Sequence, residues 1–280
     1  MQRGMTADLW TWALPLALML GAGLASGFAA GLFGIGGGFV VVPVLFIMLP
    51  LLGGTPESLA HVAIGTSLAT ILVTSLRSVQ AHARRGAVDF ALLKAWAPWI
   101  VLGVAAGVLL AARVSGAMLA LIFGAGVAIM ALHFLFPILA NRHLRDELPG
   151  GLARVGIAGG IGAFSSLLGI GGGTIAIIVM TLCGKDIHRA IATASGVGFL
   201  IAVPGTLGFI AIGLGAPDLP SGSLGYINLP ATLAIVSTSI ISAPWGAATA
   251  HRLPAAVLRP VFGLYLLFVA FTMVRNGLGG

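Results

Sequence analysis

The sequence Leu32-Phe33-Gly34-Ile35-Gly36-Gly37-Gly38 occurs twice in a recognisable form. It returns 135 residues later as Leu167-Leu168-Gly169-Ile170-Gly171-Gly172-Gly173. Four glycines in five residues weaken a helix, because each lowers the helix propensity by about 1 kcal/mol relative to alanine. We therefore predict that each half of the chain contains a helix that is broken at this sequence.

A second repeated motif follows each glycine sequence. His61–Thr66 (His-Val-Ala-Ile-Gly-Thr) is similar to His188–Thr193 (His-Arg-Ala-Ile-Ala-Thr), after a deletion of eight residues. Two motifs in the same order at similar spacing predict an internal duplication. The predicted units are a first repeat over 1–140, a cytoplasmic connecting loop over 141–150 and a second repeat over 151–280.

The composition around these motifs is that of an integral membrane protein. Hydrophobic residues make up 59% of the 280 residues and charged residues only 8%, whereas soluble domains carry about 25% charged residues. Apolar runs of about 20 residues, long enough to cross a hydrocarbon core, recur along the chain. The expected fold is therefore all-α and polytopic, and the expected location is a membrane.

Each half is predicted to contain a broken segment followed by three transmembrane helices. In the first half these are 8–50, then 60–78, 90–112 and 116–139. In the second half they are 152–183, then 187–213, 226–249 and 256–276.

The distribution of lysine and arginine predicts the topology. If each broken segment enters the membrane and returns as a re-entrant hairpin, eleven of the 14 lysines and arginines lie on one side. If both broken segments cross the membrane, the split is nine to five. Because basic residues concentrate in cytoplasmic loops, the first arrangement is favoured. Each half then makes three crossings, an odd number, which predicts repeats of inverted topology.

The broken helices are the predicted substrate site. Unwound backbone is tolerated at membrane depth only where protein or a water-filled cavity surrounds it. Half-helices that begin at Gly38 and Gly173 would direct unpaired N–H groups and a positive dipole end at an anion, although glycines also permit close helix packing. The candidate substrate-binding residues are these glycines and nearby hydroxyls: Gly34, Gly36, Gly37, Gly38, Thr66, Ser67, Ser165, Ser166, Gly169, Gly171, Gly172, Gly173, Thr193 and Ser195.

Acidic residues are missing from the predicted membrane core, since all seven Asp and Glu residues fall at helix ends or in loops. A cation site or a carboxylate proton relay would require buried acids, so a small anion is the expected substrate. We predict no metal site, no cofactor and no nucleic-acid partner. The expected partners are the anion and the lipid bilayer, and a homodimer is one oligomeric state that the sequence permits.

The chain resembles the sulfite exporter TauE/SafE family, also called the toluene sulfonate uptake permease family. The resemblance rests on Gly34–Phe39 followed by Val42–Leu45, then Gly65-Thr66-Ser67, Arg85–Asp89 and Leu168–Gly173. It covers nearly the whole chain and implies transport of sulfite, thiosulfate or organosulfonates across a bacterial inner membrane. The second half departs from the first, because Gly65-Thr66-Ser67 becomes Ala192-Thr193-Ala194.

Two other functions stay open from the residues alone. A passive channel for anions or small solutes is the first alternative. An intramembrane serine enzyme is the second, since Thr193-Ala194-Ser195-Gly196 is similar to a serine nucleophile motif. The glycine expected two residues before the serine is Thr193, however, so no catalytic residue is predicted.

Overall fold

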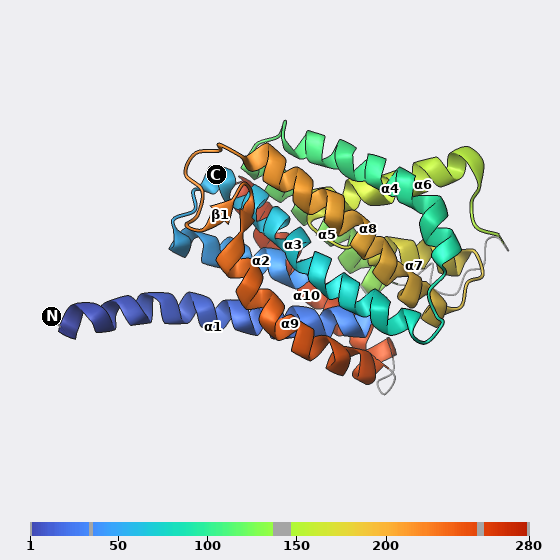
Figure 1. Cartoon of the computed structure of the whole chain (residues 1–280), viewed down its shortest axis with the longest axis horizontal. Helices are drawn as coiled ribbons and strands as arrows, with labels where there is room; N and C mark the ends of the chain where they lie inside the picture. Colours follow the sequence, from blue (N-terminus) through green and yellow to red (C-terminus); the bar gives the residue numbers. More distant parts are fainter. Residues whose placement is uncertain (1, 34–35, 137–146, 251–254, 279–280) are drawn as a thin grey trace.

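The computed structural model describes residues 2–33, 36–136, 147–250 and 255–278, and these residues are almost entirely helical. The helices pack into an elongated bundle, from which the beginning of α1 projects (Figure 1). The first half contains α1 (Gln2–Phe33), α2 (Gly38–Met48), the short 3-10 helix η1 (Leu49–Leu52), α3 (Pro56–Ala83), α4 (Phe90–Ala111) and α5 (Gly116–Leu135). The second half contains α6 (Gly151–Leu168), α7 (Gly173–Leu182), α8 (Ile187–Gly213), β1 (Ser223–Leu224), β2 (Ile227–Asn228), α9 (Leu229–Ala250) and α10 (Ala255–Leu278).

Both predicted helix breaks are confirmed, and the half-helices begin at Gly38 and Gly173 as predicted. The breaks need glycine because Gly37 (φ 76°) and Gly172 (φ 64°) adopt left-handed backbone conformations immediately before these helices. Residues with a Cβ atom rarely adopt this region. The predicted site residue Gly34 lies outside the described residues.

The three helices predicted after each break are also confirmed. They are α3, α4 and α5 in the first half and α8, α9 and α10 in the second, and the bounds agree within a few residues. Among the described residues, eight helices are long and apolar enough to cross a membrane, because α1 and α6 also qualify. Only α2 and α7 are too short. Residues 141–146 of the predicted connecting loop, 141–150, lie outside the described residues.

The bundle has two ends that differ in charge. We call the end that carries the α3–α4 and α7–α8 connections the basic end, where Lys185 Nζ lies 3.3 Å from Asp89 Oδ2. The opposite, hairpin end carries the β1–β2 hairpin, where the N–H of Ser221 donates to the carbonyl of Leu52. The chain reverses direction between α1 and α2 (Figure 1), so that α2 and η1 return to the hairpin end, at which α3 begins.

The packing between helices follows a regular scheme. α3 and α8 lie against each other at the centre, α1 packs along α9, α4 packs along α6, and α5 packs along α10. Glycines permit the close approaches: a Cβ atom on Gly103 of α4 would overlap the backbone of Gly159 in α6, and one on Gly27 of α1 would overlap that of Ser239 in α9. Small residues at helix contacts are typical of membrane bundles.

Candidate functional site

The two glycine loops meet at the centre of the bundle. A Cβ atom built on Gly36 would lie 3.5 Å from the Cα atom of Gly171. Cγ2 of Ile71, in the middle of α3, lies 3.5 Å and 3.4 Å from the Cβ positions of Gly36 and Gly171. The two breaks, far apart in the sequence, therefore come to one point beside α3.

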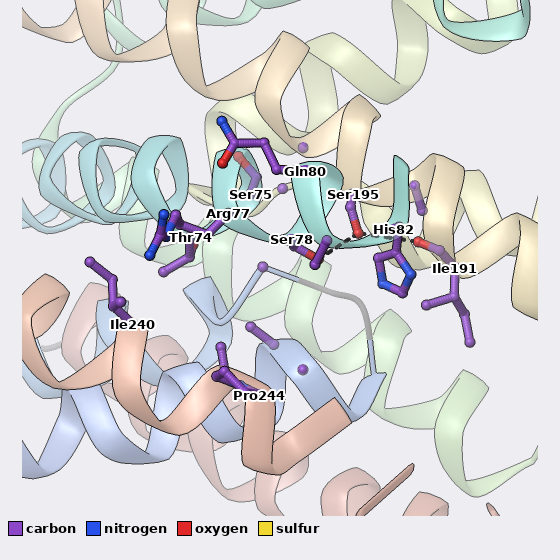
Figure 2. A pocket seen from close by; sticks show the side chains of 18 of the residues that line it. Thr74, Ser75, Arg77, Ser78, Gln80, His82, Ile191, Ser195, Ile240 and Pro244 are labelled. Carbon is purple, nitrogen blue, oxygen red and sulfur yellow. Dashed lines mark hydrogen bonds between the residues drawn. The ribbon is translucent and has the colours of Figure 1, made fainter. Parts of the chain in front are cut away.

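A cavity of about 430 Å³ extends from this point. Gly36 and Gly171 line it together with residues from α1, α3, α8 and α9. Figure 2 shows side chains that line it from α3, such as Arg77, from α8, such as Ser195, and from α9, such as Pro244. It reaches the basic end, because Arg84 and Arg85 at the end of α3 also line it. A cavity of this size is typical of small-molecule sites.

Faces of α3 and α8 form much of the cavity wall, and α3 supplies most of its polar side chains. On α3 the lining residues Thr74, Ser78 and Ala81 recur at intervals of three and four residues, so that they share one face of the helix. Ser75, Arg77, Gln80 and His82 line the cavity on either side of this face. On α8 the lining residues Ile191, Ala194, Ser195 and Gly198 follow the same spacing.

A hydrogen bond links these two faces. Ser78 Oγ of α3 and Ser195 Oγ of α8 lie 2.9 Å apart (Figure 2). Ser195 Oγ also lies within donating distance of the carbonyl of Ile191, at 3.3 Å. The structure thus places the predicted site residue Ser195 in the cavity wall, beside a serine of the other half of the chain.

The charge of the cavity is positive. Arg77, Arg84 and Arg85 line it, and all three are exposed. Within the described part of the chain these arginines form no ion pair, and no carboxylate is among the lining residues. The guanidinium groups are therefore available to an anion, which they bind through planar, charged hydrogen bonds.

Asp89 connects α4 to α8 and to the α7–α8 turn beside the basic end. Asp89 caps α4 by accepting the N–H of Leu92 at 3.0 Å, and its own N–H donates to Thr193 Oγ1 at 3.0 Å. The N–H of Leu92 and the ammonium of Lys185 hold the pKa of the Asp89 carboxyl below its usual range, although partial burial acts in the opposite direction. The predicted site residue Thr193 therefore takes part in this connection between helices.

Three other predicted hydroxyl residues lie on the side of the glycine loops away from the cavity, towards the hairpin end. Ser67 Oγ donates to the carbonyl of Gly169 at 2.7 Å, which ties α3 to the second glycine loop. Thr66 Oγ1 accepts the N–H of Asn228 at 2.9 Å. Ser166 Oγ donates to the carbonyl of Ala163 at 3.0 Å within its own helix.

Ser165 is the exception among these hydroxyls. It is fully buried, and its Oγ has no hydrogen-bond partner among the described residues. It lies close to the second glycine loop, since a Cβ atom on Gly172 would be 2.8 Å from Ser165 Oγ. Buried hydroxyls normally have a partner, whereas the hydrogen-bonding capacity of Ser165 Oγ is unused by the described residues in this conformation.

The remaining predicted glycines form the packed loops and do not line the cavity. A Cβ atom on Gly37 would be 2.7 Å from the carbonyl oxygen of Ser26, and one on Gly38 would overlap that of Gly169. Gly169 packs on Ile64 of α3. The other two, Gly172 and Gly173, are buried at the beginning of α7.

Sequence reasoning missed the polar face of α3 that carries the charge. Arg77 and Ser78 were assigned to the end of the predicted helix 60–78, while α3 continues to Ala83. The signal was present as polar residues at helical spacing, namely Thr74, Arg77 and Ser78. A continuous helix over these residues would have placed them on one face.

A helical bundle with eight span-length helices, two broken helices that meet and one basic cavity defines a polytopic membrane transporter. The family model of the sulfite exporter TauE/SafE matches residues 19–273. The chain belongs to this family.

Curated relatives agree with this class. A probable membrane transporter protein of Haemophilus influenzae is 37% identical over 260 residues, which cover 92% of this chain and 97% of the relative. A probable membrane transporter protein of Methanocaldococcus jannaschii is 26% identical over 91% of this chain and 96% of its own length. Another from Bacillus subtilis is 24% identical over 95% of this chain and 99% of its own length. No solved structure gives a significant match.

Proposed function

We propose that this transporter carries small sulfur-containing anions, such as sulfite, thiosulfate or short organosulfonates, and binds them in the cavity above Gly36 and Gly171. The observation that carries the proposal is the charge of the lining. Three arginines and several hydroxyls line the cavity, and no carboxylate does within the described residues. Oxyanions require such donors.

The half-helices add to this charge. No side chain caps the first turn of α2 or of α7, since glycine precedes each helix. The first N–H groups of a helix carry a partial positive charge that favours an anion nearby. The positive ends of both helices lie next to the point at which Gly36 and Gly171 meet.

The size and lining of the cavity bear on the class of anion. A volume of about 430 Å³ is much larger than a bare sulfite ion, and small apolar residues such as Ala30, Ala194 and Ala243 alternate with the polar ones. The space suits a hydrated inorganic oxyanion, and it equally suits an organosulfonate whose carbon chain contacts the apolar wall. Sulfonates and inorganic sulfur oxyanions are therefore both included in the proposal.

The proposal includes two repeats of inverted topology, 1–140 and 151–280. The helix directions support the inversion, because α3 begins at the hairpin end and its counterpart α8 begins at the basic end. The contacts support the duplication, because exchanging the halves in element order turns the α1–α9 contact into the α6–α4 contact. The same exchange maps the α3–α8 and α5–α10 contacts onto themselves. Substrate sites of inverted-repeat transporters lie where the repeats meet, near the bilayer midplane.

The basic end is assigned to the cytoplasm under this proposal. It carries Arg84, Arg85, Lys185 and Arg189 among the described residues, whereas Arg113 and Arg275 lie at the hairpin end. The positive-inside rule favours this orientation. The cavity then opens to the cytoplasm.

A binding screen tests the substrate class. Purified protein is titrated calorimetrically with sulfite, thiosulfate, a short alkanesulfonate and, as matched controls, chloride and acetate. We expect saturable binding of at least one sulfur oxyanion and no comparable binding of acetate. Absence of binding for every sulfur anion, in protein that remains folded and monodisperse, would contradict the proposal.

A further inference from the structure

The cavity reaches the glycine loops from the basic end only, and the other side of the loops is closed. Leu68, Ile71 and Ile201 are fully buried there. The Cβ position of Gly205 in α8 lies 3.0 Å from Leu68 Cδ1 in α3, which leaves no space between the two helices. A transporter must open a second route on this side.

The relation between the halves identifies which residues that route would contain. A shift of 135 residues relates α1 to α6, and a shift of 127 relates α3 to α8. Contacts in one half have counterparts at the shifted positions in the other. Ser78 maps onto Gly205 and Ser195 maps onto Leu68, and each of these two pairs is in contact. The Gly37–Ser26 contact likewise maps onto a Gly172–Ile161 contact, at 3.1 Å.

The same shifts map three small residues of the cavity wall onto hydroxyl residues on the closed side, while Thr74 maps onto the apolar Ile201. Ala30 and Gly31, which line the cavity, map onto Ser165 and Ser166, and Ala194 maps onto Ser67. Ser165 Oγ is fully buried without a partner in the described structure. Ser67 Oγ is bonded to the Gly169 carbonyl of the glycine loop itself.

We propose that Ser165 and Ser67 form a second set of substrate contacts, exposed to the hairpin end when α3 and α8 separate at Leu68 and Gly205. This inference rests on the proposed anion transport and adds the exit half of the path. The unpartnered Oγ of Ser165 then has a ligand in the other state of the protein. Because Arg77 maps onto Pro204, this second site is uncharged and binds the anion through neutral donors.

An outer layer covers the closed route. The Tyr226 ring, which follows β1, stacks on the His61 ring of α3 with centroids 4.9 Å apart. A Cβ atom on Gly65 would overlap the carbonyl of Tyr226, and the N–H of Asn228 donates to Thr66. Opening the route therefore requires the β1–β2 hairpin to move away from the beginning of α3.

Cysteine accessibility tests the inference. In a Cys183→Ser parent, Ser165→Cys and Ser78→Cys are each treated with a membrane-impermeant methanethiosulfonate reagent in vesicles of either orientation. We expect Ser78→Cys to react from the basic end. We expect Ser165→Cys to react only from the hairpin end, and several-fold faster when thiosulfate is present on both sides. Reaction of Ser165→Cys from the basic end, or none from the hairpin end in a variant that transports, would overturn the inference.

A cross-link between α3 and α8 gives a second test of the inference that does not depend on Ser165. The double variant Leu68→Cys/Gly205→Cys places one thiol on each side of this helix contact, where the Gly205 Cβ position lies 3.7 Å from Leu68 Cγ, within reach of a short bifunctional thiol reagent or of direct oxidation. Oxidation should abolish flux, retain anion binding from the basic end and be reversed by reductant, whereas either single variant should be insensitive to oxidant. Full flux after complete cross-linking would overturn the inference.

The two proposals fail in different ways. If the parent binds and carries no sulfur anion, the substrate proposal fails. The two-sided labelling pattern, measured with no anion added, still decides whether the second route exists.

Discussion

At the scale of single residues, Gly171 offers a direct test of the site with little disturbance of the fold. Its φ lies outside the left-handed region, and an added Cβ atom would meet its nearest neighbours at 3.4 to 3.7 Å, an ordinary contact distance. Gly37 and Gly172 are less informative, because their left-handed backbone would strain any substitution.

We predict that Gly171→Ala lowers transport about tenfold, a loss of about 1.4 kcal/mol in substrate binding, while the protein stays folded. The methyl group enters the point at which the two glycine loops meet the cavity. Gly156→Ala is the matched control, because a Cβ atom on Gly156 in α6 has no neighbour within 4 Å. Flux into proteoliposomes is measured at equal reconstituted protein. Equal flux in the two variants would remove Gly171 from the site.

Arg77 is the lining arginine that lies within α3, next to the buried lining residues Thr74 and Ser75. We predict that Arg77→Gln raises the KM for the anion about tenfold, or about 1.4 kcal/mol. This is less than the roughly 4 kcal/mol of two charges at 4 Å in an effective dielectric of 20, because Arg77 is exposed. Arg77→Lys should retain part of the effect, and increasing ionic strength should reduce the difference.

Arg275→Gln serves as the control for Arg77, since it removes one exposed positive charge at the hairpin end. An unchanged KM in Arg77→Gln, or an equal rise in Arg275→Gln, would show that local charge in the cavity does not attract the substrate.

At the scale of elements, Asp89 connects α4 to α8 and to the α7–α8 turn. We predict that Asp89→Ala lowers the free energy of unfolding by about 1 kcal/mol at pH 7, the usual effect of losing a helix N-cap. Asp89→Asn, which keeps a capping oxygen, should cost less. Thermal unfolding in detergent measures both.

The pH dependence of this effect follows from the lowered pKa of Asp89. A carboxyl whose pKa is lower in the folded state stabilises the protein above its unfolded pKa, and the contribution disappears as the pH falls through the folded value. The difference between wild type and Asp89→Asn should therefore be present at pH 7, begin to shrink as the pH falls below about 4, and disappear only once the pH is below the lowered pKa of the folded state. A difference that persists at low pH would contradict this account of Asp89.

The elements themselves could be predicted because their signals are local. Long apolar runs set the helices, and the glycine clusters set the beginnings of α2 and α7 at Gly38 and Gly173. The site was predicted less completely, since contacts between distant segments decide which side of a helix faces the cavity. Thr66 and Thr193 bear hydroxyls at suitable depth, yet they accept backbone N–H groups of Asn228 and Asp89. Nothing local to either residue indicates these partners.

At the scale of the whole molecule, the central claim is that one substrate path passes between two related halves. Three features fit this arrangement. Gly36 and Gly171 meet at the centre, the basic cavity lies between this point and the basic end, and a closed contact that bears hydroxyl groups lies towards the hairpin end. A passive channel would need a continuous opening. In the described structure, Leu68 packed on Gly205 and Tyr226 stacked on His61 close the hairpin end.

Counterflow in proteoliposomes tests this claim most directly. Vesicles loaded with unlabelled thiosulfate or sulfonate are diluted into a trace of the labelled anion, and the labelled anion inside is followed with time. A carrier with one alternately exposed site predicts transient accumulation above the external concentration, saturation with substrate, and loss of both in Gly171→Ala. Simple equilibration without accumulation, at a rate proportional to concentration, would contradict the account.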